Sequence, residues 1–196
     1  MGDPLLRPAA VVPPFGANGI EFQPPGCTPG VLPCALYVAN TANRQILEIL
    51  CCDMNGNAFP ATVFVNGING PDGIAIDSTT GNIWVASGQS DEIVVIQPRS
   101  AAPPNTQVGK VIAKLGDFNG LEAFAPGQNR AREFLFPASL SFSNLPPVGP
   151  AQRMLYVSNL ASPNADSIDT AWTTQVTDYT VAQLPVPTIP STCLFR

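Results

Sequence analysis

Hydrophobic and polar residues alternate with a period of two in short runs, and turn residues separate one run from the next. Residues 70–87 give the clearest example, with the text Gly-Pro-Asp-Gly-Ile-Ala-Ile-Asp-Ser-Thr-Thr-Gly-Asn-Ile-Trp-Val-Ala-Ser. A short alternating strand leads into a Gly-centred turn, and a second strand follows that ends in small polar residues. This pattern predicts a β-hairpin.

The hairpin text recurs on both sides of this run. First strands begin at Ile20, Ile74 and Leu140, and the matching second strands are Leu36–Asn40, Ile83–Ser87 and Leu155–Asn159. Self-similarity at a long interval indicates a repeat architecture before local propensity is considered. The chain therefore carries three copies of one strand unit.

Each copy extends beyond its hairpin. Strands are expected at 19–22, 35–40, 45–50 and 61–65 in the first copy, at 73–77, 82–87, 92–97 and 110–116 in the second, and at 138–142, 154–160 and 174–184 in the third. Four antiparallel strands make one propeller blade. The fold class predicted is all-β, a β-propeller segment of about three four-stranded blades in a single partial domain. The blades are expected at 15–66, 67–117 and 134–185, the third one incomplete, with a tail at 186–196.

Composition limits the possible partners. Hydrophobic residues make up 45% of the 196 residues and charged residues 12%, which indicates a chain with an apolar core. The net charge of −5 and only two lysines, Lys110 and Lys114, argue against a nucleic-acid partner. No run of 18 apolar residues is present, so no membrane partner is expected. The first residues lack the features of a signal peptide, and the compartment stays unknown. An extracellular or periplasmic location is favoured if the full-length protein carries such a peptide.

The five cysteines are Cys27, Cys34, Cys51, Cys52 and Cys193. Cys27 and Cys34 flank a loop rich in proline and glycine, where a disulfide and free thiols are equally compatible with the sequence. Cys51 and Cys52 are adjacent and would need a strained bond to pair. The chain has no histidine, and the cysteine spacing does not match a structural zinc site.

Candidate chemistry lies just before the innermost strands. Alignment of the copies makes Asn18, Asp72 and Ala138 equivalent, and such positions surround one mouth of a propeller channel. Carboxylate and amide oxygens there suit a hard cation, although Ala138 interrupts the ring. Asn-Gly and Asp-Gly are also common turn dipeptides, and spacing alone favours the turn over the metal site.

Other polar and aromatic residues have simpler interpretations. Asp77 precedes Ser-Thr-Thr-Gly and is expected to cap the hairpin through its own side chain. Trp84, Ile93 and Val95 lie on alternating strands, where packing between blades is favoured over stacking on a cofactor.

Three segments together resemble a known family: Ala17–Phe22, Gly70–Asp77 and Gly81–Ala86. They are similar to the senescence marker protein/gluconolactonase/luciferin-regenerating enzyme family, the regucalcin-like six-bladed propellers. The resemblance covers residues 15–160 and corresponds to the C-terminal half of such a propeller. It implies that Asn18 and Asp72 are metal ligands for a divalent cation, which is calcium or else magnesium, manganese or zinc.

The same resemblance implies an activity. The family's cation polarises a lactone carbonyl and lowers the pKa of bound water, and Asp72 would be the catalytic group that handles protons. The expected activity is that of a metal-dependent lactone or ester hydrolase, with a small lactone or ester as substrate. An acidic ligand from the family's first blade and an amide from the middle of its chain have no counterpart here.

A second hypothesis is a non-catalytic propeller of the NHL or YVTN type that acts as a binding scaffold, because the text at 36–43 is close to those repeats. Asp72 directly after Pro71 favours the hydrolase, and the missing ligands favour the scaffold. Under either hypothesis, three blades leave two apolar blade faces uncovered. We therefore expect a missing N-terminal half or self-association.

Overall fold

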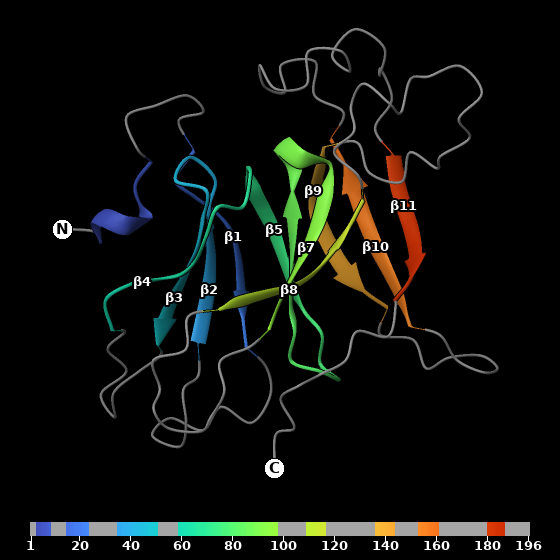
Figure 1. Ribbon diagram of the computed structural model, residues 1–196, viewed down its shortest axis with the longest axis horizontal. Helices are drawn as coiled ribbons and strands as arrows, with labels where there is room; N and C mark the ends of the chain where they lie inside the picture. The colour runs from blue at the N-terminus through green and yellow to red at the C-terminus, as the bar shows by residue number, and fades with distance from the viewer. Residues whose placement is uncertain are drawn as a thin grey trace, which may run out of the picture.

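The computed structural model describes residues 3–8, 15–23, 35–50, 59–97, 109–116, 136–143, 153–160 and 180–186. These residues form three antiparallel sheets arranged side by side (Figure 1). In chain order the elements are η1 (Pro4–Leu6), β1 (Ala17–Phe22), β2 (Ala35–Asn40), β3 (Gln45–Leu50), β4 (Thr62–Asn66), β5 (Pro71–Ile76), β6 (Ile83–Ser87), η2 (Gly88–Ser90), β7 (Glu92–Gln97), β8 (Lys110–Leu115), β9 (Pro137–Phe142), β10 (Met154–Asn159) and β11 (Thr180–Pro185).

The predicted fold class is confirmed. Sheet 1 has the order β1-β2-β3-β4, sheet 2 the order β5-β6-β7-β8, and sheet 3 the order β11-β10-β9, so consecutive strands are neighbours throughout. The expected strand at 174–184 is seen as β11, and residues 174–179 lie outside the described residues. All five cysteines also lie outside them. Both helices of the described residues are three-residue 3₁₀ turns, and neither has the length or apolar character needed to span a membrane.

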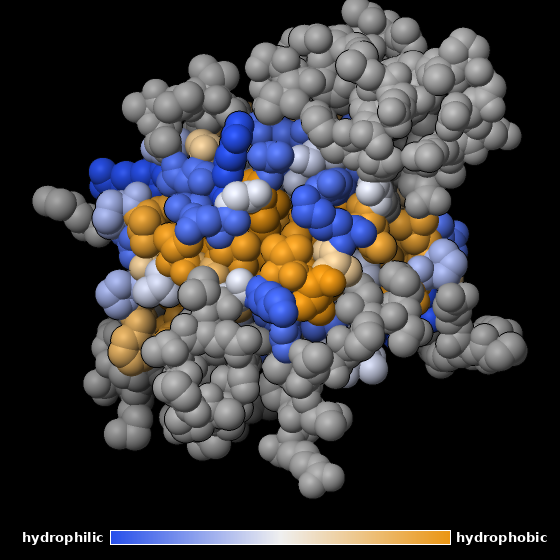
Figure 2. Space-filling view, in the orientation of Figure 1, coloured by the Kyte–Doolittle hydropathy of each residue, from blue (hydrophilic) through white to orange (hydrophobic). Residues whose placement is uncertain are grey.

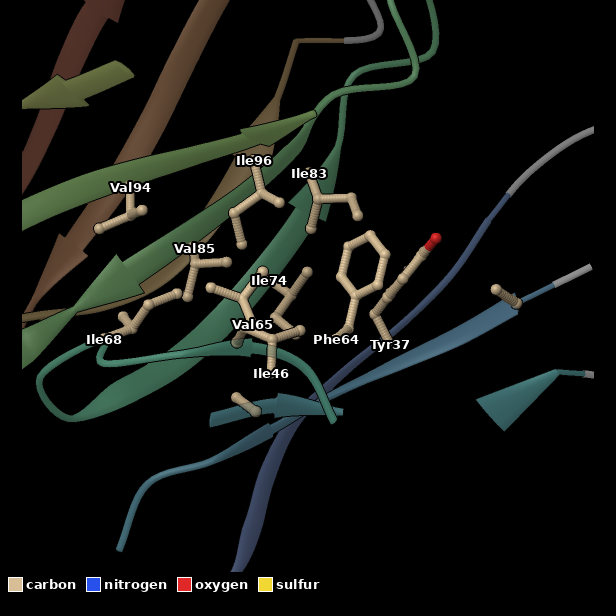
Figure 3. Close-up of a cluster of buried hydrophobic side chains, with 12 residues drawn as sticks. Tyr37, Ile46, Phe64, Val65, Ile68, Ile74, Ile83, Val85, Val94 and Ile96 are labelled. Atoms are coloured by element: carbon tan, nitrogen blue, oxygen red, sulfur yellow. The ribbon is translucent and has the colours of Figure 1, made fainter. Parts of the chain in front are cut away.

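Sheet 2 is apolar on both of its faces. All five residues of β6 are buried, and five of the six residues of β7 are buried. One face packs on sheet 1, where Ile83, Val85 and Ile96 approach Tyr37 and Phe64 (Figure 3). The rings of Tyr37 and Phe64 lie 5.1 Å apart between their centroids. Since burial of a large apolar side chain contributes about 1.5–3 kcal/mol, this interface is a major part of the core.

The opposite face of sheet 2 packs on sheet 3. Trp84, Ile93 and Val95 form one buried cluster with Leu155 and Val157. The Trp84 ring also meets the Phe142 ring edge to face, with 5.6 Å between the ring centroids. The prediction that Trp84, Ile93 and Val95 pack between blades is therefore confirmed.

The innermost strands β1 and β9 both lie against β5, with very little space between the backbones. A Cβ atom added at Gly19 would collide with the carbonyl oxygen of Asp72. A Cβ atom added at Gly73 would lie 2.6 Å from both the Ala138 carbonyl oxygen and the Ser139 Cα. Glycine at these two positions is required because a neighbouring strand occupies the place of a side chain.

The turn interpretation of Asn18-Gly19 and Asp72-Gly73 is wrong. Both dipeptides lie inside strands, β1 and β5, and not before them. The pairing register shifts between Ala17 and Ile20 and again between Pro71 and Ile74, which marks a bulge in each strand. Such a bulge changes the direction of a side chain without ending the strand.

The outer face of sheet 1 is apolar. Its cross-strand rows are Ile20, Val38, Leu47 and Val63, followed by Phe22, Leu36 and Ile49. Leu5 and Leu6 of η1 pack on the centre of this face. The Asn40 amide nitrogen donates to the Leu5 carbonyl at 2.7 Å and holds the segment in place. Ile20 and Phe22 remain 58% and 45% exposed.

The outer face of sheet 3 differs, and the expectation of two apolar outer faces is correct only for sheet 1. The rows that point away from sheet 2 consist largely of hydroxyl and amide side chains: Ser141, Tyr156 and Gln183 in one row, and Ser139, Ser158 and Val181 in the other. A mainly polar face is compatible with contact to water. Figure 2 shows that apolar atoms instead form a band across the side where β4 and β8 lie.

An ion pair connects sheets 2 and 3 at the end of the sheets opposite η2. Asp77 caps its hairpin as predicted, because its carboxylate accepts from the Thr79 amide at 2.8 Å and from the Thr80 hydroxyl at 3.0 Å. The same buried carboxylate also accepts from the Arg153 guanidinium, which lies 4.8 Å above the centre of the Phe142 ring. Burial raises the pKa of Asp77, but these hydrogen bonds and the Arg153 charge together outweigh burial, so the pKa is lowered overall.

Replacement of Gly73 by alanine tests the close approach of the innermost strands. We expect Gly73→Ala to lower the free energy of unfolding by about 3 kcal/mol, because β5 and β9 must separate. Gly67→Ala is the matched control. A Cβ atom there meets nothing within 4 Å, and only its positive φ of 82° opposes the change, so we expect about 1 kcal/mol. Urea unfolding of both variants measures the difference, and equal losses would contradict the packing explanation.

The lowered pKa of Asp77 predicts a dependence of stability on pH. A carboxyl whose pKa is lower in the folded chain stabilises the fold above its unfolded pKa of about 4 and loses that contribution as the pH falls below it. At pH 7 we expect Asp77→Asn to cost about 2 kcal/mol in the free energy of unfolding. The difference from the wild-type chain should shrink between pH 4 and pH 2 in urea unfolding. A difference that stays constant over this range would show that the charge of Asp77 is not involved.

Candidate functional site

The two predicted ligand residues lie at one end of the sheets, on neighbouring strands. Asn18 is the second residue of β1 and Asp72 the second residue of β5. Gly19, next to Asn18, packs directly on the Asp72 carbonyl. Ala138 holds the equivalent place in β9 and offers no side-chain oxygen. The structure thus brings Asn18 and Asp72 together as neighbours at this end.

The Asp72 carboxyl group has no counterion in the part of the chain that the structure describes. Its side chain is partly buried, and among the described residues no hydrogen-bond donor or cation reaches it. Burial raises its pKa from 3.8 to about 6. A carboxylate that loses water without gaining a partner is costly, and such groups are concentrated at binding sites and catalytic sites.

The Asn18 amide has one hydrogen-bond partner. Its Nδ2 donates to the Thr41 hydroxyl at 3.2 Å, and that hydroxyl donates to the Pro71 carbonyl at 2.7 Å. The Asn18 Oδ1 has no donor among the described residues. Thr41 was not identified from the sequence, because it lies in the turn after β2 and bonds to the following repeat. A single threonine in a turn gives no indication in the sequence that its hydroxyl bonds to a distant strand.

The other polar groups at this end bond to one another. Ser87 donates to the Asn69 carbonyl at 2.7 Å, and the Asn69 amide donates to the Ser90 hydroxyl at 2.8 Å. Asp91 adopts a left-handed conformation with φ 51°. Its side-chain Oδ1 accepts a hydrogen bond from the Phe136 backbone N–H at 2.6 Å. Asp91 therefore connects sheet 2 to sheet 3, whereas Asp72 makes no such contact. Within the described part of the chain, no group of three or more Asp, Glu, His or Cys residues could hold a metal ion.

The strand order, the packed innermost strands and the oxygen-bearing end define this protein as a segment of a β-propeller. Residues 16–103 match a family model described as the SMP-30/gluconolactonase/LRE-like region. The match supports, over that span, the family resemblance seen in the sequence.

Comparison with solved structures supports the fold. A luciferin-regenerating enzyme superimposes with a TM-score of 0.57 at 17% sequence identity, and the match covers 90% of this chain. It covers 47% of that enzyme, so this chain spans about half of its length. No curated protein matches the chain significantly. Identity this low shows a shared fold, and the activity of the chain is a separate question.

Titration of the cation-free chain tests the environment of Asp72. We expect its carboxyl carbon to titrate near pH 6 in NMR spectra, two units above an exposed aspartate, because burial disfavours the charged form. A midpoint near pH 4 for Asp72 would show that water or an unseen donor solvates the group.

Proposed function

We propose that Asn18 and Asp72 form part of a divalent-cation site in a lactone or ester hydrolase of the gluconolactonase type. The observation that carries this proposal is the partly buried Asp72 carboxylate, which lies beside the Asn18 amide. Among the described residues, neither this carboxylate nor the Asn18 carbonyl oxygen has a hydrogen-bond partner. The match of residues 16–103 to the SMP-30/gluconolactonase/LRE-like family model agrees with it.

The residues present fit a hard cation. A carboxylate and an amide carbonyl are both oxygen donors, and calcium, magnesium and manganese prefer such ligands, whereas zinc favours nitrogen and sulfur. A positive ion would also supply the charge that the Asp72 carboxylate lacks. The direction of the pKa shift therefore agrees with a ligand role, since the ionised form is disfavoured until a cation arrives.

Catalysis would use the same residues. A bound divalent cation polarises a substrate carbonyl and acidifies a coordinated water. Asp72 would accept the proton from the attacking water and return it to the leaving alcohol oxygen when the ester bond breaks. The ionised form, which a bound cation would favour, is the form that can accept this proton. Asn18 would contribute its side-chain carbonyl oxygen as a ligand beside Asp72.

Two ligands do not complete a cation site. Calcium takes six to eight oxygens, so most of the coordination shell must come from water, substrate or other protein groups. This chain spans about half of the luciferin-regenerating enzyme that it matches. Further blades, from a longer chain or from a second copy, would supply the remaining ligands. The exposed Ile20 and Phe22 on the apolar face of sheet 1 offer a contact surface for them.

A non-catalytic scaffold remains the second candidate. The observation that favours it is the absence of any three-residue acidic or metal-binding group from the described residues. In that case the Asp72 carboxylate would attract a cationic side chain of a partner protein. Divalent cations would then bind equally to the wild-type chain and to a variant that lacks the Asp72 carboxylate.

Cation binding by the Asp72→Asn variant separates the two candidates. With so few protein ligands we expect a Kd of about 1 mM for calcium or manganese in the wild-type chain. Asp72→Asn should weaken binding at least tenfold, because the only charged ligand is lost. Its thermal midpoint at pH 8 should not fall, since a costly buried charge is removed. Manganese relaxation and calorimetry measure the binding.

Glu92→Gln is the matched control, because it removes a carboxylate that is paired with Lys114 and lies outside the site. It should bind cations as the wild-type chain does. Equal and negligible affinity in all three proteins would overturn the metal site and leave the scaffold. Loss of binding in both variants would indicate a nonspecific effect of charge.

A further inference from the structure

A short chain of hydrogen bonds crosses from sheet 1 to sheet 2 beside the candidate cation site. Asn18 Nδ2 donates to Thr41 Oγ1 at 3.2 Å, and Thr41 Oγ1 donates to the Pro71 carbonyl at 2.7 Å. Thr41 is 9% exposed, so water has little access to its hydroxyl group. Pro71 directly precedes Asp72, and the chain therefore connects the two candidate ligand residues through one buried hydroxyl.

The direction of these hydrogen bonds is fixed by chemistry. A threonine hydroxyl has one proton, and a backbone carbonyl can only accept. The Thr41 hydroxyl therefore donates its one proton to the Pro71 carbonyl, and toward Asn18 the Thr41 Oγ1 can only accept a hydrogen bond. Of the two ends of an asparagine amide, only the nitrogen donates. Asn18 must therefore turn its nitrogen toward Thr41, which leaves its Oδ1 pointing away from Thr41 and free to bind a cation.

We propose that Thr41 is a positioning residue, which holds the Asn18 amide in the orientation that presents Oδ1 to the divalent cation. This inference rests on the cation site proposed above. Groups that orient a metal ligand through its other polar atom are a general feature of metal sites. Without the hydroxyl the amide can rotate by 180° and turn its nitrogen, which cannot bind a cation, toward the site.

The other sheets support this assignment because they lack the same chain of bonds. Strand pairing makes Asn40, Ser87 and Asn159 equivalent, since each faces the first residue of its innermost strand. The residues that follow them are Thr41, Gly88 and Leu160.

Gly88 has no hydroxyl, and a Cβ atom at this position would lie 3.1 Å from the Phe136 ring. The contact between sheets 2 and 3 is thus apolar at this point, and Ala138 replaces the acidic residue there. Among the described residues, the buried hydroxyl and the two oxygen ligands occur together only between sheets 1 and 2.

Three variants test the assignment. Thr41→Val keeps the shape of the side chain and removes the hydroxyl, and we expect its affinity for manganese or calcium to fall about 10-fold to 100-fold. Thr41→Ser keeps the hydroxyl and should stay within about threefold of the wild-type affinity. Thr80→Val is the matched control, because it removes a partly buried threonine hydroxyl from the opposite end of sheet 2, where it bonds Asp77 at 3.0 Å. Its affinity should not change.

A second measurement needs no cation. In the cation-free chain, the Asn18 side-chain proton that bonds Thr41 should exchange with water more slowly in the wild-type and Thr41→Ser proteins than in Thr41→Val. This readout tests the hydrogen-bond chain itself, and circular dichroism confirms that each variant is folded.

The outcomes separate the two proposals. Weakened binding in Thr41→Val alone supports the positioning role. Unchanged binding in Thr41→Val, or an equal loss in Thr41→Ser, overturns that role while the cation site stands. A wild-type chain that binds no divalent cation overturns the cation site and, with it, the role of Thr41 toward the ion. In that case slow exchange at Asn18 would still identify Thr41 as a structural bridge between the sheets.

Discussion

Burial of sheet 2 on both faces is the constraint that organises this protein. Strands β6 and β7 carry apolar side chains on both sides, so the sheet is unstable in water unless a neighbouring sheet covers each face. Sheets 1 and 3 provide that cover through the Tyr37 and Phe64 cluster on one side and the Leu155 and Val157 cluster on the other. This sandwiching places β1 and β9 against β5, where glycine permits the backbones to meet.

The position of the candidate site follows from that arrangement. The innermost strands lie side by side, so the second residues of β1 and β5 meet at the same end of the sheets. Asp72 is held there by packing of the backbone around it, and burial raises its pKa. Among the described residues it receives no hydrogen-bond donor. A buried ionisable group without a partner lowers the stability of the fold, and such groups are often found at functional sites. The contrast with Asp77 and Asp91, which both have hydrogen-bond partners, makes Asp72 stand out.

The sequence predicted most of the fold, because alternation and repetition are local signals that side-chain chemistry imposes directly. Of the eleven strands in the described residues, ten were expected within two residues of their observed ends, and the last, expected at 174–184, is described at Thr180–Pro185. The capping role of Asp77 and the packing role of Trp84 were predicted correctly. Contacts between repeats were missed. Arg153, Thr41 and the bulges at Asn18 and Asp72 depend on which strand of the next sheet lies alongside, and the residues themselves carry no mark of that neighbour. The Asn-Gly and Asp-Gly dipeptides were misread as turns for the same reason.

The unlike outer faces of sheets 1 and 3 restrict how a closed ring can be made. A head-to-tail dimer would place the apolar rows around Val38 and Leu47 of one copy against the serine-rich rows of sheet 3 of the other. That heterologous junction is poorly matched, because hydroxyl groups would lose water without gaining partners. An isologous contact would join the apolar sheet 1 faces of two copies across a twofold axis. The blades of the two copies would then not surround one shared propeller channel. The two outer faces of this chain are therefore poorly matched to each other as partners in a head-to-tail ring.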